Sequence, residues 1–294
     1  MDFQLSPQLE LLRKSVREFA EGAIAPKVQH MEETDEVPWE LYKELAKQMY
    51  LGILIPKEFG GTAFGNLARM IMLEEIGRVS AAMAMATQIF QMGTASIVDF
   101  GNEAQKKKYL PALARGERLG TIAVTEATGG SDPTGIQTTA KLQGDSYVLN
   151  GRKCFITHGH VADTITIMAK TGEGPKGFSA FIVEKSFPGF KLGRKEKKFG
   201  LHGCNTGEIV MENCIVPREN LLGNEGDGLR FPWPRSVKWA GPVWPDAAWG
   251  SSMPVWKLRL SLPMKECWGE SPLASTRPSS GISPTCTWIW RPAV

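Results

Sequence analysis

Apolar side chains recur every three or four positions in the first part of the chain, as they do along one face of an α-helix. Ser6 and Pro7 suit the N-cap and first position of such a helix, and Leu9, Leu12 and Val16 begin its apolar stripe. The stretch IPKEFGGTAFG, rich in Pro and Gly, interrupts the pattern. We therefore predict an N-terminal α-helical domain at residues 1–118, with further helices at 38–49, 67–79 and 81–100.

From about Gly120 the period changes to the alternation of apolar and polar positions that is typical of strands. The segment SYVLNGRKCFIT places apolar residues on both sides of Asn150-Gly151, a dipeptide suited to a type I′ turn, and so predicts a hairpin. TITIMAK, GFSAFIVEK and GEIVMENCIVP continue as strands. The fold class is therefore α+β, with a small β-barrel or sandwich domain at residues 119–230.

Composition describes a globular chain, with 42% hydrophobic and 22% charged residues among 294. Residues 231–294 contain seven Lys/Arg and three Asp/Glu, so they supply more than the whole net charge of +3. We therefore expect neither a nucleic-acid nor a membrane partner. The first residues show no signal peptide, which predicts a cytoplasmic location. The five cysteines lack the C-x-x-C spacing of a zinc site, and we expect buried free thiols.

The segment AVTEATGGSDPTG, residues 123–135, is the stretch most suited to chemistry. Its adjacent Gly129 and Gly130 let the backbone approach an anion or a flat ring at distances that a β-carbon forbids. A plain surface loop is the alternative, and spacing alone favours it. Glu126 and Asp132 are interpreted as structural carboxylates that hold the turn. His158 and His160 have no third ligand nearby, so we expect no metal site.

AVTEATGGSDPTG resembles the flavin-binding signature of the acyl-CoA dehydrogenase family at Thr125-Glu126 and Gly130-Ser131-Asp132. Other segments resemble the family in the same order, and the resemblance covers residues 1–230. It implies an FAD-dependent enzyme of three domains, namely a helical domain, a β domain and a C-terminal four-helix bundle. Nothing after residue 230 resembles that bundle. The supporting segments are LRKSVREFAEGAIAP, LGILIPKEFGG, FGNEAQKKKYLPALARGE, VLNGRKCFITHGHVADTITIMAKT and FGLHGCNTGEIVMENCIVPRENLLGNEGDG.

The resemblance also implies roles for individual residues. It places Ile122, Val124 and Thr125 against the isoalloxazine ring, with the Thr125 hydroxyl at its polar edge. Gly130 and Ser131 would approach the cofactor pyrophosphate, and Ser131 also the phosphopantetheine arm of the substrate. On the other side of the ring would lie Phe155, Ile156 and Thr157, with Thr157 near N5 and Phe155 where the family usually has tryptophan.

The implied reaction is the α,β-dehydrogenation of an acyl-CoA, with electrons passed to an electron-transfer flavoprotein. A base removes the α proton while a hydride leaves the β carbon for the flavin. In the family the base is a glutamate of the C-terminal domain, which also forms much of a homotetramer interface. The resemblance therefore provides no catalytic residue in this chain, which we expect to be inactive as written. Acyl chain length stays open, although Ile89 and Met92 are candidates for lining the pocket.

Two further functions stay open at this stage. An acyl-CoA oxidase or flavin monooxygenase of the same fold would differ in rapid reoxidation of the flavin by oxygen. A non-catalytic remnant would bind FAD, a CoA ester or a partner protein.

Residues 231–294 contain eight tryptophans and ten prolines without helical or strand periodicity. One hypothesis is a Pro/Trp-rich recognition tail. The other is a shifted reading frame, because tryptophan has the single codon TGG and therefore constrains the displaced frame. Re-read in that frame, residues 231–252 and 275–292 resemble helices of the family's C-terminal domain. We expect an out-of-frame or disordered tail.

Overall fold

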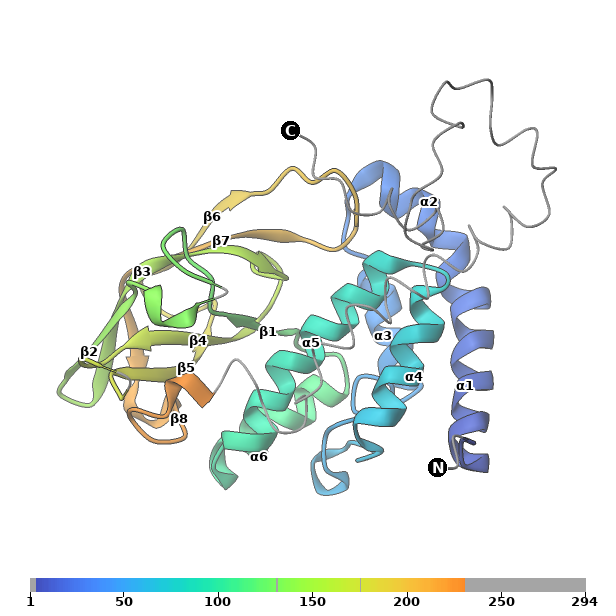
Figure 1. The fold of residues 1–294 in the computed structure, drawn as a ribbon, viewed down its shortest axis with the longest axis horizontal. Helices are drawn as coiled ribbons and strands as arrows, with labels where there is room; N and C mark the ends of the chain where they lie inside the picture. Colours follow the sequence, from blue (N-terminus) through green and yellow to red (C-terminus); the bar gives the residue numbers. More distant parts are fainter. Residues whose placement is uncertain (1–3, 131, 175, 231–294) are drawn as a thin grey trace, which may run out of the picture. The chain divides into compact units, whose positions relative to one another are not determined.

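A computed structural model of the chain describes residues 4–130, 132–174 and 176–230. The predicted Trp/Pro-rich tail, with Cys267 and Cys286, lies outside the described residues. The described chain begins with helices and continues with a mixed sheet, which confirms the predicted α+β class (Figure 1). The α-helices are α1 (Pro7–Phe19), α2 (Ala25–Thr34), α3 (Trp39–Lys47), α4 (Gly65–Gly77), α5 (Ala81–Phe100) and α6 (Glu103–Ala114).

Local chemistry explains where the helices begin. Ser6 is the N-cap of α1, and its hydroxyl accepts a hydrogen bond from the backbone N–H of Leu9, as the sequence predicts. Asn102 and Gln105 form a reciprocal capping box at the start of α6. The helix predicted at 81–100 is α5, and most of its side chains are buried. Among the described residues, no helix combines the length and the apolar character needed to span a membrane.

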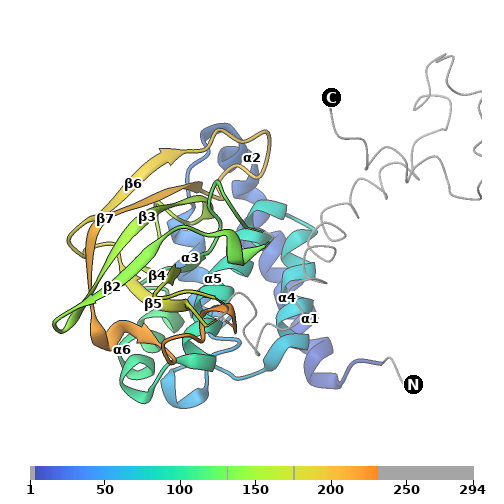
Figure 2. The ribbon, with the colours of Figure 1, turned by 60° about the vertical axis from the view of Figure 1, so that its left-hand side comes forward.

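The strands of the described residues form one sheet in the order β6-β7-β3-β2-β4-β5-β8, with β1 paired to β4 (Figures 1 and 2). β1 and β2 pair with β4 in parallel, whereas the other neighbours are antiparallel. The strands are β1 (Gly120–Ala123), β2 (Thr139–Gln143), β3 (Ser146–Thr157), β4 (Thr164–Lys170), β5 (Phe178–Glu184), β6 (Phe190–Lys195), β7 (Thr206–Pro217) and β8 (Leu221–Leu222).

The predicted hairpin at Asn150-Gly151 is wrong, because β3 runs through this dipeptide. The adjacent turn is Gly144-Asp145, which joins the paired residues at the ends of β2 and β3. At Asn150 the register shifts, and the bulged partner Asn213 of β7 takes the left-handed conformation with φ 50°. Gly151 serves close packing instead of a turn, because a Cβ there would lie 2.7 Å from the Cα of Thr138.

Helix α5 packs directly on strand β1 (Figure 1). A Cβ at Gly93 would lie 2.7 Å from the backbone nitrogen of Thr121, so the two backbones touch without a side chain between them. β5 is buried on both faces, because Phe181 and Val183 lie in the core of the sheet while Ala180 and Ile182 pack with the helices. The sheet and the helices therefore share one apolar boundary.

Polar contacts join the helices to the strand region. In Figure 2, α2 lies beside the segment between β6 and β7. Asp35, at the end of α2, binds the ammonium of Lys195 of β6 and the backbone N–H of Gly203 in that segment. Deeper in the protein, the Tyr42 hydroxyl of α3 lies 2.6 Å from Nε2 of His158. Neither ring is exposed to solvent, and burial lowers the pKa of His158 to about 4. The imidazole is therefore neutral in the folded protein.

We predict that His158 makes the protein sensitive to acid. Its folded-state pKa of about 4 lies below the ordinary value of 6.5, so below pH 6.5 the unfolded chain binds a proton that the folded chain excludes. The contribution of the neutral His158 to the free energy of unfolding is complete above pH 6.5. It is lost progressively as the pH falls from 6.5 toward 4. Between pH 7.5 and 4.5 the free energy of unfolding should decrease by about 2.5 kcal/mol from this residue alone.

Urea unfolding of the wild type and His158→Gln across that pH range measures this contribution. The variant should lose the His158 part of the acid destabilisation, and His30→Gln, at an exposed position, is the matched control. An acid dependence of equal size in His158→Gln and wild type would contradict the prediction.

Candidate functional site

The segment that follows β1 is fastened to the end of β3. The backbone N–H of Cys154 donates to the carbonyl oxygen of Thr125 at 2.9 Å, and the Lys153 ammonium donates to the carbonyl oxygen of Val124 at 3.0 Å. One step earlier in β1, the Thr121 hydroxyl donates to the carbonyl oxygen of Thr157. The two stretches that the sequence singles out, around Thr125 and around Phe155–Thr157, are therefore neighbours in space.

Glu126 closes the loop between β1 and β2 from the inside. Its carboxylate accepts hydrogen bonds from the backbone N–H groups of Gln137 and Thr138 and from the Thr138 hydroxyl. It also forms a 2.8 Å ion pair with Lys153, whose side chain is 0% exposed. The two ends of the loop are thus tied to one carboxylate, as expected from the structural interpretation of Glu126.

The two charges of this pair stabilise each other against burial. Burial opposes ionisation of Glu126, but the Lys153 charge and the hydrogen bonds outweigh it, so the pKa of this carboxyl lies below its ordinary value. Burial lowers the pKa of Lys153 to about 8, although Glu126 opposes this shift. Both groups are therefore charged at neutral pH, and removing either one strands the other in the interior.

The tip of the loop depends on its glycines. A Cβ at Gly130 would lie 2.8 Å from Cγ2 of Thr125, so Gly130 rests on the Thr125 side chain. A Cβ at Gly129 would lie 2.9 Å from the carbonyl oxygen of Asp132. Asp132 accepts hydrogen bonds from the backbone N–H and hydroxyl of Thr134 and caps the short helical turn Pro133–Gly135. Ser131 lies outside the described residues.

The side chains of the remaining predicted residues differ in their solvent exposure. Ile122 and Val124 are partly exposed and lie on the same side of the strand by alternation. Phe155 is 64% exposed and has φ 56°, at a bulge where β3 has one residue more than β7. Ile156 instead lies in the core of the sheet, and Thr157 is half-buried. Phe155 therefore presents an apolar ring that the described residues leave largely uncovered.

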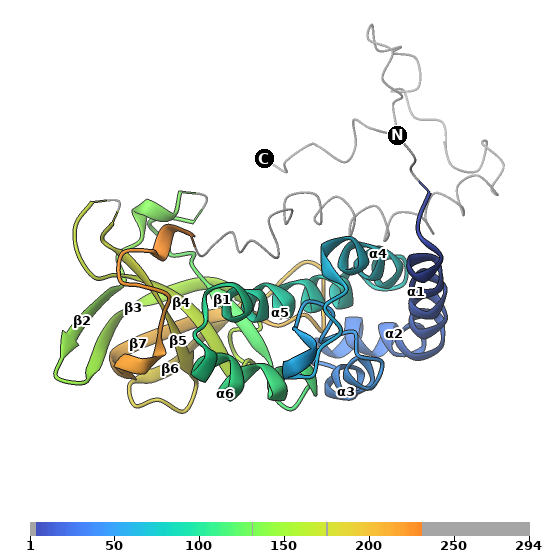
Figure 3. The same ribbon diagram turned by 90° about the horizontal axis from the view of Figure 1, so that it is seen from below.

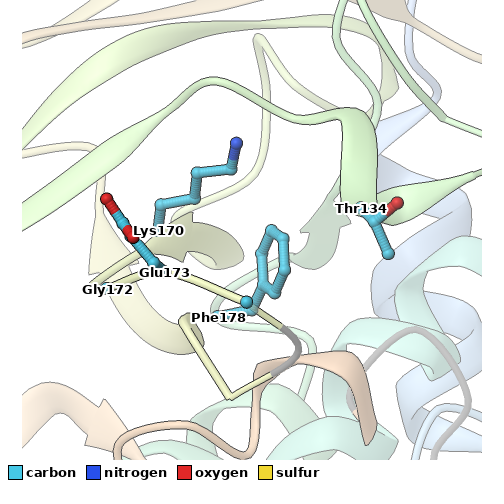
Figure 4. Close-up of a pocket in the computed structure, with 6 residues that line it drawn as sticks. Thr134, Lys170, Gly172, Glu173 and Phe178 are labelled. Carbon is cyan, nitrogen blue, oxygen red and sulfur yellow. The ribbon is translucent and has the colours of Figure 1, made fainter.

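A cavity of about 490 Å³ lies beside the same loop (Figure 4). Thr134 lines it from the loop, Lys170 from the end of β4, and Phe178 from the start of β5. The Lys170 ammonium lies 5.8 Å from the centre of the Phe178 ring. The cavity therefore combines a cation and an aromatic surface, with Glu173 also in its lining.

Other titratable groups have structural surroundings. Cys154, Cys204 and Cys214 are buried free thiols, as expected. His158 and His160 follow the end of β3, and His160 contacts the carbonyl oxygen of Glu208. Among residues 4–130, 132–174 and 176–230, no three His, Cys, Asp or Glu side chains are placed to hold a metal ion.

Models of two domains of one protein family match the chain. The N-terminal domain of acyl-CoA dehydrogenase matches residues 6–117, and the middle domain matches residues 121–214. The chain therefore belongs to the acyl-CoA dehydrogenase family, which confirms the resemblance found in the sequence.

Relatives and solved structures agree with this result. An acyl-CoA dehydrogenase of Bacillus subtilis is 46% identical over 224 residues, which are 75% of this chain and 59% of that protein. A chain in the structure of the electron transferring flavoprotein of Acidaminococcus fermentans has a TM-score of 0.81 and 36% identity, covering 85% of this chain and 66% of that one. An acyl-CoA dehydrogenase of Bacillus anthracis, solved with FAD, has a TM-score of 0.81 and 32% identity, and the match covers 89% of this chain and 46% of that one. This chain thus spans about three fifths of the B. subtilis relative.

We predict that Lys153→Met destabilises the protein strongly. Methionine fills a similar volume but leaves the Glu126 carboxylate buried without its counter-charge, which should lower the free energy of unfolding by about 3–5 kcal/mol. Denaturant unfolding followed by circular dichroism measures the change.

Lys191→Met is the matched control, because its ion pair with Glu212 joins side chains that are 60% and 59% exposed. Such a surface pair contributes less than about 1 kcal/mol. Equal losses in the two variants would show that burial gives the Lys153 pair no special importance.

Proposed function

We propose that this chain forms the FAD- and acyl-CoA-binding part of an FAD-dependent acyl-CoA dehydrogenase. The observation that carries the proposal is that the segment starting at Thr125 is held against β3 beside the exposed Phe155. The hydrogen bond from Cys154 to Thr125 and the Lys153–Glu126 ion pair hold it there, in a chain of this family. In this proposal the substrate is an acyl-CoA thioester that loses a hydrogen from each of its α and β carbons.

The residues that the structure describes fit a flat, apolar ring with a phosphate-bearing arm. Phe155 leaves an aromatic face open, and partly exposed Ile122 and Val124 give β1 an apolar surface. Gly130 lets the loop backbone pack directly on Thr125, because a Cβ there would lie 2.8 Å from Cγ2 of that side chain. These features support FAD contacts by Ile122, Val124, Thr125, Gly130, Phe155, Ile156 and Thr157, for Ile156 through its backbone. We add Ser131 from the family resemblance alone.

When bound, FAD would supply the acceptor for the hydride from the β carbon. The chain's own task is to hold ring and thioester in place and to keep water from them. Thr121 contributes by fixing the carbonyl of Thr157, the residue proposed to lie near the reactive position of the ring. The Glu126–Lys153 pair contributes by keeping the loop ends together while ligands come and go.

The cavity at Lys170 supports the position of the CoA part of the substrate. The cavity lies next to the loop that contains Ser131. The Lys170 ammonium suits a phosphate group, and the Phe178 ring suits stacking on a nucleobase. We therefore place the phosphopantetheine arm at Ser131 and the nucleotide end of CoA toward Lys170. The thioester would then lie between the loop and Thr157.

The base that removes the α proton is proposed to belong to the family's C-terminal domain, which nothing after residue 230 of this chain resembles. The described part of the chain corresponds to about three fifths of a relative, which supports this division of the enzyme. We infer that this chain binds FAD and acyl-CoA without turnover, and that the complete enzyme passes electrons to an electron-transfer flavoprotein in the cytoplasm. The similarity to a chain in an electron transferring flavoprotein structure supports that partner.

FAD binding tests this proposal, and Gly130→Ala is the sharpest variant. The added methyl group would displace Thr125 or the loop, which should weaken FAD binding by about tenfold or more, because both are proposed to contact the cofactor. Quenching of FAD fluorescence on titration with the purified chain gives the dissociation constants.

Gly22→Ala is the control, because a Cβ at Gly22 would meet no atom within 4 Å. It should bind FAD as the wild type does. A folded wild-type chain that leaves FAD fluorescence unchanged at high protein concentration would overturn the proposed function.

A further inference from the structure

Arg69 of α4 is a buried cation without a carboxylate partner among the described residues. Its side chain is 0% exposed. Nε donates to the side-chain oxygen of Asn66 at 3.2 Å, and Nη1 donates to that of Gln88 at 2.8 Å. Both acceptors are neutral, and Nη2 is buried with no hydrogen-bond partner in the described part of the chain. Three of the five guanidinium N–H bonds therefore remain available to one further acceptor.

The same helix shows how this protein otherwise treats a buried charge. Glu75, 2% exposed, forms ion pairs with Arg17 and Arg78 at 2.9 and 3.1 Å, and Arg13 lies within 3.7 Å. A buried charge is strongly unfavourable unless it is paired and hydrogen-bonded. The lack of such a partner at Arg69 therefore requires its own explanation.

Arg69 is connected through α5 to the proposed flavin strand. α4 and α5 lie side by side (Figures 1 and 3), and Gln88 of α5 holds the guanidinium. Gln88 also donates to the sulfur of Met92, next to Gly93, where α5 touches Thr121 of β1. From Gly93 back to Gln88 the helix rises by about 7.5 Å. Gln88, which holds Arg69, thus lies about 1.4 helical turns along α5 from the contact with β1.

We propose that Arg69 and Gln88 recognise a carboxylate at the far end of the acyl chain, so that the preferred substrate is a dicarboxylic acid monothioester of CoA. This inference rests on the proposed function and specifies its substrate class. A carboxylate can accept from the free N–H bonds of Nη1 and Nη2 together, in the forked geometry that guanidinium groups favour. A neutral alkyl end would leave those donors unsatisfied.

The experiment compares charged and neutral acyl ends on the purified full chain with excess FAD. The charged probes are the CoA monothioesters of succinic, glutaric and adipic acids, and the neutral probes are the same thioesters with the terminal carboxylate replaced by its isosteric amide. Calorimetric titration gives each affinity. We expect at least one carboxylate to bind about tenfold or more tightly than its amide, because charge-assisted hydrogen bonds are the stronger ones.

Two variants separate recognition from structural support. Arg69→Met should abolish the preference for the carboxylate, whereas Arg78→Met, which removes another cation from the end of the same helix, should keep it. Gln88→Glu places a carboxylate beside the guanidinium within the protein. It should fold at least as well as the wild type and also lose the preference, so the test does not depend on the folding of Arg69→Met.

The possible outcomes are distinct. Affinities for carboxylate and amide within twofold at all three lengths would overturn the inference and leave the proposed function intact. A preference that survives in Arg69→Met or Gln88→Glu would overturn it as well. If no CoA thioester of either kind binds, the proposed function fails and the inference falls with it.

Discussion

The candidate site depends on one buried ion pair. Lys153 lies on β3 and Glu126 on the loop after β1, so their contact joins segments 27 residues apart in the chain. The same ammonium holds the Val124 carbonyl, and the same carboxylate holds two backbone N–H groups at the far end of the loop. Because both side chains are almost completely buried, neither has an alternative partner of equal strength. The pair thereby fixes both ends of a glycine-rich loop in place.

The residues around this ion pair fall into an open side and a buried side. The bulge at Phe155 is kept open, since its exposed ring leaves room for a ligand, and Gly130 lets the neighbouring loop pack on Thr125. The helices behind them are packed and apolar, apart from a few polar groups such as Arg69 and Gln88. Polar groups are retained in such a core only where a specific partner compensates their burial. This contrast is why the open side suggests cofactor binding and the buried side suggests selection among substrates.

Local patterns were sufficient for much of the fold, but contacts between distant residues were not. Ser6, Pro7 and the stripe after them specify a helix start by themselves, and the alternation in TITIMAK specifies β4. Asn150-Gly151 misled because a positive φ suits a bulge region as well as a turn, and the choice depends on pairing with β7. The family signature located the loop, yet the roles of Lys153 and Arg69 required partners 27 and 19 residues away. A lysine within the strand segment KCFIT was the available signal for Lys153.

The contact of α5 with β1 at Gly93 has a mechanical consequence. Side chains normally act as a compliant layer between a helix and a sheet, and they absorb small shifts by changing rotamer. Here backbone meets backbone, so that layer is missing at this point. A displacement of α5 by a fraction of an ångström would be passed to Thr121 and along the strand with little loss. We therefore expect helix α5 and strand β1 to move together as one rigid unit.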